Sequence, residues 1–167
     1  MDYETKNHLE LVNSQSSNDK GCSLWDFMDR CQSAMGSRLL KRWIEMPLLD
    51  VNQINQRQQA VSKLIQDFML RENLKEHLMY VYDMERLASR MAYGNASPRD
   101  VLQLVATLEH AKPILELASS LESYPEFMNT PSCQDLYQLI QGAIVPDPPL
   151  TMKDGGVFPT RLQSRIG

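Results

Sequence analysis

Three cationic side chains lie close together in the stretch "MGSRLLKRW" at positions 35–43. Arg38, Lys41 and Arg42 could contact nucleic-acid phosphates, bind an anionic membrane surface, or form the solvated face of an ordinary helix. At ~100° per residue they fall on one half of a helix and the apolar residues on the other. The apolar half is needed for a core, which disfavours a membrane anchor. We interpret the stretch as a core-packing helix whose outer face is a weak basic patch, and the sequence leaves open whether that patch faces DNA or another domain.

Other chemistry-bearing residues show no spacing typical of a catalytic or metal site. There is no G-x-x-x-x-G-K-[ST] phosphate loop and no H-E-x-x-H motif. His8, His77 and His110 are scattered, and none shares a helix face with a second metal ligand. Asp83 and Glu85 fit the first turn of a helix rather than a pair of catalytic carboxylates. We therefore expect no catalytic residue, no metal ligand and no cofactor-binding residue in this chain.

The composition indicates one domain or one piece of a larger protein. The chain has 167 residues, of which 43% are hydrophobic and 23% charged, enough for one sizeable core. Its net charge of −4 gives no general signal for nucleic-acid binding, so any basic contact must be local. Three cysteines without C-x-x-C spacing, and the lack of a signal peptide or a long apolar run, predict a reduced cytoplasmic protein.

Capping signals divide the chain into helices. Each start is a serine or aspartate followed by an amphipathic stretch, and in two cases an aspartate three residues later completes a capping box. The predicted caps are Ser23, Ser33, Asp50, Asp83, Ser97 and Ser132. A further helix is predicted over residues 70–80. Pro47 and Gly94 mark helix ends, and Pro113 should kink or divide the long helix that begins at Pro98.

These patterns predict an all-α fold, an irregular multihelical bundle with short extended segments at both ends. Residues 1–22 form an extended and loop segment, with "HLELV" extended; residues 23–145 form the helical domain, and six to eight helices are expected in all. Residues 146–167 form an extended segment with a hairpin turn at residues 154–156 and a tail. Gln103 is expected to be exposed. The residues expected to be buried are Trp43, Val61, Leu64, Leu87, Met91, Leu104 and Leu108.

Three ordered motifs resemble a known family. "DYETKNHLEL" is similar to D-x-x-T-x-x-N-L-E-L, and "SLWDFMDRCQSAMGSRLLKRW" is similar to S-L-L-x-x-L-D-R-T-x-T-x-M-G-x-R-L-L-x-x-W. "MERLASRMAYGNASPRDVLQL" is similar to L-E-R-L-x-S-R-x-A-x-G-x-A-x-P-R-D-L-x-x-L. The chain resembles the core or lever region of the MutS family of DNA mismatch-repair proteins over about residues 2–158.

The resemblance implies a mechanical role. In this family other domains probe the mismatch, clamp the duplex and hydrolyse ATP, and the lever helices join them. The chain would therefore need no cofactor of its own, ATP and Mg²⁺ would bind in the full-length protein, and DNA would be contacted through other domains. Its partners would be the clamp and ATPase domains of the same chain, with a dimer formed through the ATPase domain and no membrane. The alternative is a free-standing helical interaction or scaffold module.

Overall fold

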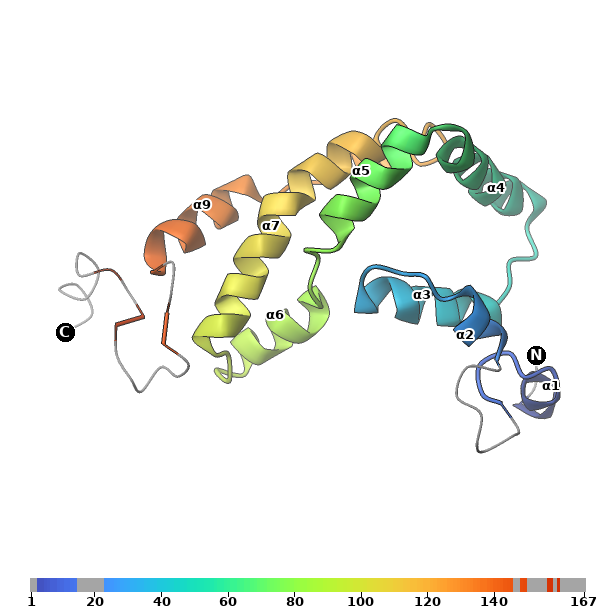
Figure 1. Ribbon diagram of the computed structural model, residues 1–167, viewed down its shortest axis with the longest axis horizontal. Coiled ribbons are helices and arrows are strands. Elements are labelled where there is room, and N and C mark those ends of the chain that lie inside the picture. The colour runs from blue at the N-terminus through green and yellow to red at the C-terminus, as the bar shows by residue number, and fades with distance from the viewer. Residues whose placement is uncertain (1–2, 15–22, 146–147, 150–155, 158, 160–167) are drawn as a thin grey trace.

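The computed structural model describes residues 3–14, 23–145, 148–149, 156–157 and 159, and these residues form helices without a strand (Figure 1). The all-α prediction is confirmed. Nine helices are found in the described residues, rather than six to eight, because two short ones add to the expected set. They are α1 (Tyr3–His8), α2 (Leu24–Met28), α3 (Ala34–Glu45), α4 (Val51–Gln66), α5 (Phe68–Leu78), α6 (Met84–Ala92), α7 (Pro98–Ala118), α8 (Glu126–Asn129) and α9 (Gln134–Ala143).

The longest helix, α7, begins at the strongest start signal in the sequence. The Ser97 hydroxyl accepts a hydrogen bond from the Asp100 amide (3.2 Å), and the Asp100 carboxylate accepts one from the Ser97 amide (2.9 Å). Pro98 occupies the first turn, where its missing N–H costs nothing. The helix continues through Pro113 without dividing, and Figure 1 shows it bending along its length, as expected for an internal proline.

Two buried apolar clusters lie along α7 and join it to its neighbours. Leu87 of α6 packs with Leu104 and Leu108 in the first half of α7, and Tyr137 and Ile140 of α9 cover this cluster. The second cluster lies toward the other end of α7. Its buried members come from α5 and from the turn after α7, and the side chains packed against them come from α4, α7 and α8. These are Leu70, Leu74 and Leu121, with Leu64, Ile114, Leu117 and Phe127 packed against them. The helix α7 is therefore held by a core in each half.

The turn between α5 and α6 is fastened to the middle of α7. Thr107 of α7 is 2% exposed, and its hydroxyl accepts a hydrogen bond from the Tyr82 amide (3.0 Å). The same hydroxyl donates to the carbonyl of Gln103 (2.9 Å). Gln103 itself is half-buried, so the prediction that it is exposed was wrong. The hydrogen bond from Tyr82 to Thr107 thus fixes the turn between α5 and α6 on α7.

The N-terminal helices form a separate unit, which we call the arm (residues 3–14 and 23–46). We call residues 51–145, from α4 to α9, the body. The predicted caps Ser23 and Ser33 are confirmed, since each hydroxyl accepts a backbone N–H three residues on. Neither α2 nor α3 contains a buried residue, however. Figure 1 shows α3 lying apart from α4 and α5 along most of its length.

Two residues expected in the core lie at the surface instead. Trp43 of α3 is 40% exposed and Val61 of α4 is 54% exposed. Both sit on the apolar stripe of an amphipathic helix, but neither belongs to a buried cluster of the described residues. Among the other five, Leu87, Leu104 and Leu108 are buried, while Leu64 and Met91 are partly buried against the two clusters.

Several predicted boundaries also change. "HLELV" was expected to be extended, but its first residue, His8, ends α1, and residues 9–12 form turns and bends. Glu4 in the first turn and Lys6 in the last favour α1. The helix predicted over residues 70–80 starts earlier, because Asp67 caps it by accepting from the Leu70 amide (3.0 Å). Cys133, with a φ of 53°, rather than Ser132, precedes α9.

The C-terminal segment lies mostly outside the described residues. The predicted hairpin turn falls at residues 154–156, of which the structure describes only Gly156, with a φ of 73°. Just beyond it, the buried residue Val157 accepts a hydrogen bond from the Val145 amide (3.1 Å). The end of α9 and this segment therefore lie side by side at that point.

Candidate functional site

Arg38, the first residue of the predicted basic patch, forms the main charged contact between the arm and the body. Its guanidinium donates to both carboxylate oxygens of Asp83 (2.7 and 3.0 Å) and to Glu85 (3.1 Å). Asp83 also caps α6, because its carboxylate accepts from the Arg86 amide (3.3 Å). The hydrogen bonds from Arg38 hold the pKa of Asp83 below its usual range. The charge of Arg38 is thus compensated within the molecule.

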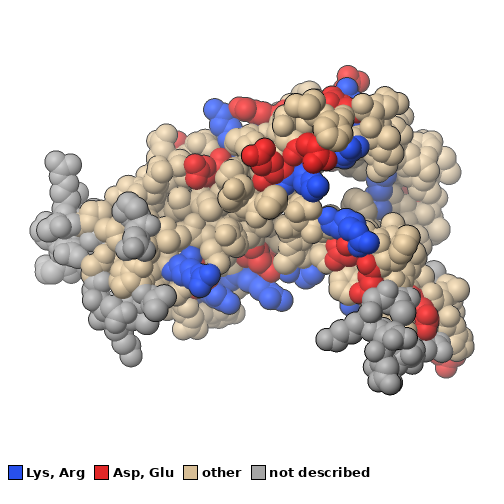
Figure 2. Space-filling model, viewed as in Figure 1, with Lys and Arg blue, Asp and Glu red and all other residues tan. Residues whose placement is uncertain are grey.

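Lys41 and Arg42 lie on the same helix but differ in their surroundings. The Lys41 ammonium lies 5.3 Å from the centre of the Trp25 ring, a cation–π contact that holds α2 against α3. Arg42 is exposed, and no ion pair or ring contact of its side chain is found among the described residues. Figure 2 shows basic side chains in several separate groups with acidic ones between them. Contact of this patch with DNA or another domain stays a prediction.

A second cationic contact joins the arm to the body. The Arg57 guanidinium of α4 lies 3.6 Å from the centre of the Trp43 ring of α3. The sequence places Arg57 on the apolar stripe of α4, where a positive charge conflicts with burial. Stacking on an aromatic face resolves that conflict, because the ring takes the place of a carboxylate partner.

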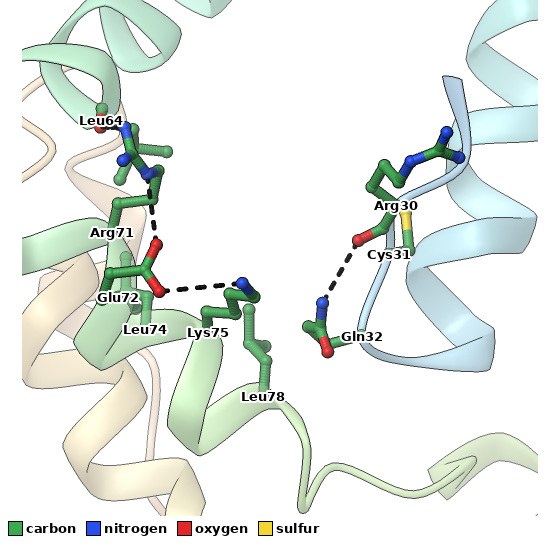
Figure 3. A pocket seen from close by; sticks show the side chains of 9 residues that line it. All are labelled: Arg30, Cys31, Gln32, Leu64, Arg71, Glu72, Leu74, Lys75 and Leu78. Atoms are coloured by element: carbon green, nitrogen blue, oxygen red, sulfur yellow. Dashed lines mark hydrogen bonds and ion pairs between the residues drawn. The ribbon is translucent and has the colours of Figure 1, made fainter. Parts of the chain in front are cut away.

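A cleft of about 730 Å³ separates the arm from the body (Figure 3). One wall is the loop before α3, with Arg30, Cys31 and Gln32. The other wall comes from α4 and α5 and contains Leu64, Arg71, Glu72, Leu74, Lys75 and Leu78. Glu72 pairs with both Arg71 (3.5 Å) and Lys75 (3.7 Å), so much of the positive charge on this wall is balanced locally.

The cysteine at this cleft is poorly suited to nucleophilic chemistry. Burial and the neighbouring Asp29 carboxylate raise the pKa of the Cys31 thiol. Asp29 itself accepts hydrogen bonds from the Ser37 hydroxyl and from the Cys31 amide, which lower the pKa of its carboxyl. The reactive thiolate is therefore disfavoured, and these residues instead shape the turn that leads into α3.

The sequence patterns did not predict one contact between two histidines. His77 of α5 and His110 of α7 were interpreted as scattered, but their Nδ1 atoms lie 2.8 Å apart. The two positions are 33 residues apart, so no local spacing signals the contact, and only the packing of α5 on α7 creates it. Among the described residues, no group of three or more His, Cys, Asp or Glu side chains is arranged to hold a metal ion.

The described residues form an all-helical protein in which the helices of the body pack around the long helix α7 through two apolar clusters, and ion pairs join the arm to the body. Within the described part of the chain, no helix has the length and apolarity needed to cross a membrane. Comparison with known proteins gives the family.

The chain belongs to the MutS family, because the family model described as "MutS domain III" matches residues 4–164. It is similar to the DNA mismatch repair protein MutS of Bacillus subtilis strain 168, with 41% identity over 162 residues and 95% of this chain covered. The proteins of the same name from Bacillus pumilus and Staphylococcus epidermidis are 41% and 36% identical over 99% of the chain. The chain spans only 19–20% of the length of these relatives.

Proposed function

We propose that this chain is the core and lever segment of a MutS-type mismatch-repair ATPase, linking the DNA-binding clamp mechanically to the ATPase domain. The long helix α7 carries the proposal. Its 21 residues span roughly 32 Å at ~1.5 Å per residue, with one buried cluster in each half. A rigid element fixed in two cores transfers a displacement of one core to the other.

In this proposal the chemistry takes place in other parts of the protein. ATP and Mg²⁺ bind in the ATPase domain, through which the protein also dimerises, and DNA is held by the clamp and the mismatch-reading domain. This segment catalyses no reaction. Lys41 and Arg42 add at most a weak, salt-sensitive contact with DNA or a neighbouring domain. The similar proteins are bacterial, which supports a role in the cytoplasm, on the nucleoid.

Exposed apolar side chains support the interpretation as a segment of a larger protein. Leu39 and Trp43 of α3 are 46% and 40% exposed, and Val61 and Ile65 of α4 are 54% and 67% exposed. Exposed apolar surface of this kind is typical of an interface. The same observation would fit the alternative, a free-standing scaffold module that covers this surface with a separate partner. A phosphate-loop motif, G-x-x-x-x-G-K-[ST], encoded downstream in the same reading frame would favour the segment of a larger ATPase over the free-standing module.

The lever role is tested by interrupting α7 without touching a ligand site. Gln103 is unsuitable because it is half-buried and its carbonyl accepts from Thr107. Glu109, in the middle of α7, is exposed. Glu109→Pro in the full-length protein removes one backbone hydrogen bond of the helix and costs about 3 kcal/mol or more. We expect it to weaken the effect of ATP on mismatch affinity, and the effect of mismatched DNA on ATP affinity by the same factor.

Glu109→Ala is the matched control, because it removes the same side chain and keeps the helix. The measurement is a pair of titrations, each with and without the other ligand, beside a melting curve that confirms folding. Affinity for each ligand alone should change much less than the coupling. Undiminished coupling in a folded Glu109→Pro variant would show that α7 is a passive strut.

A further inference from the structure

Two imidazole rings face each other where α5 packs on α7. The Nδ1 atoms of His77 and His110 are 2.8 Å apart, and the ring centres are 5.1 Å apart with the planes inclined at 52°. His110 is also stacked on Tyr80, with ring centres 4.3 Å apart and planes within 6° of parallel. Both histidines are partly buried, so solvent still reaches the pair.

The hydrogen bond shows which atoms face the space between the rings. An N–H···N bond has one nitrogen as donor and the other as acceptor. One Nδ1 atom therefore already directs its lone pair at the other ring. The second Nδ1 becomes a lone-pair donor when its proton moves to the Nε2 atom of the same ring, a change of tautomer that leaves the imidazole neutral.

We propose that His77 and His110 form a binding site for a divalent first-row transition-metal ion, coordinated by both Nδ1 atoms. At metal–nitrogen distances of about 2.0–2.1 Å, a right angle at the metal places the nitrogens roughly 2.9 Å apart, and a tetrahedral angle roughly 3.3 Å apart. The observed 2.8 Å thus needs little or no separation of the helices. Each ring has only to turn so that its lone pair meets the other at the metal.

The donor set selects the class of ion. Neutral imidazole suits Cu²⁺, Ni²⁺ and Zn²⁺, whereas Mg²⁺ and Ca²⁺ prefer oxygen ligands. Within the described residues no third His, Cys, Asp or Glu completes the site, so water fills the other positions and the ion exchanges readily. The bound ion cross-links α5 to α7 and stabilises the folded state by mass action. The site stands independently of the lever proposal.

The test is calorimetric titration of the 167-residue chain with NiCl₂, with Cys22, Cys31 and Cys133 replaced by serine in every variant to remove thiol ligands. His77→Gln and His110→Gln should each weaken Ni²⁺ binding at least tenfold. His8→Gln is the matched control, because His8 lies exposed on α1 in the arm, and it should leave the affinity unchanged. Ni²⁺ should raise the melting temperature of the parent and of His8→Gln only.

A second measurement keeps the proposal testable if one glutamine variant folds poorly. The electron paramagnetic resonance spectrum of bound Cu²⁺ should show hyperfine splitting from two imidazole nitrogens in the parent, and from one in a histidine variant. Equal Ni²⁺ affinity in the parent and in His110→Gln would overturn the proposal. So would a Cu²⁺ spectrum that keeps two nitrogens when either histidine is removed, or one that changes in His8→Gln alone.

Discussion

The helices α3 and α7 have similar amphipathic sequences but differ in how much of their apolar face is buried. Both begin at a serine cap, and both alternate apolar and polar residues at helical spacing. The helix α7 buries Leu104, Thr107 and Leu108, whereas α3 buries no residue at all. The body is held by apolar cores, while the arm is joined to it by the ion pair of Arg38 and the cation–π contact of Trp43. An amphipathic pattern therefore predicts which face is apolar, and the neighbouring helices decide whether that face is buried.

Truncating a leucine in each helix should give the largest contrast between body and arm. Leu108→Ala opens a cavity at a site that is 2% exposed and should cost about 2–5 kcal/mol of unfolding free energy. Leu39→Ala, at a position 46% exposed on α3, should cost less than about 1 kcal/mol. Urea denaturation of both variants measures the difference. Similar losses would mean that the arm has a core of its own.

The sequence predicted local features correctly and the burial of some residues wrongly. Caps were predicted correctly at Ser23, Ser33 and Ser97, because a cap depends on residues three positions apart. The burial of Trp43 and Val61 was predicted wrongly, because it depends on segments far away in the sequence.

The candidate site was harder to predict. The contact between His77 and His110, and the pairing of Arg38 with Asp83, exist only once helices have packed. Neither has a local spacing that could reveal it. The sequence indicated the three cations on one face of α3, but it could not show that one of them is neutralised by another helix.

The second contrast concerns two aspartates in first turns of helices. Asp100 is 5% exposed and accepts from the Ser97 amide and from Arg90, whose Nη1 lies 2.6 Å from its carboxylate. Asp100→Ala should cost about 1.5–3 kcal/mol, the usual range for hydrogen bonds to a charged group. Asp135 is exposed in the first turn of α9, a helix that has no side-chain cap, so Asp135→Ala should change stability little. Thermal melts of both variants provide the comparison.

Asp100 also gives the body a dependence on pH. The backbone hydrogen bond from Ser97, assisted by its hydroxyl and by Arg90, lowers the pKa of Asp100 in the folded state. The stability it contributes is therefore complete above the unfolded pKa of about 3.9 and is lost as the pH falls through the folded value. Unfolding free energies measured from pH 6 down to pH 3 should fall less steeply in Asp100→Ala. Parallel curves would contradict this role.

A smaller effect should come from the turn between α5 and α6. Thr107→Val keeps the shape of the side chain but leaves the Tyr82 amide without its acceptor, which should cost about 1–3 kcal/mol, partly recovered where water reaches the amide. Thr107→Ser restores the hydroxyl and should recover most of the loss. Chemical denaturation of the two variants separates the hydrogen bond from the packing. A larger loss in Thr107→Ser than in Thr107→Val would assign the stability to the methyl group instead.

The smallest expected effect on global stability is also the one that tests how the arm is attached. Arg38→Met removes the ion pairs to Asp83 and Glu85. The Arg38 side chain is 41% exposed, so water weakens these pairs and the unfolding free energy should hardly change. Neither buried cluster of the described residues includes the arm, so none replaces that contact, and α3 should open more often on its own. Hydrogen exchange should therefore quicken in α3 amides and stay unchanged in α7.

Arg42→Met is the matched control, since Arg42 lies on the same helix without an ion-pair partner among the described residues. The difference between the two variants should shrink as salt screens the Arg38 contact in the parent. If both variants exchange alike at low salt, the ion pair does not hold the arm, and the stacking of Arg57 on Trp43 is the contact that remains to do so.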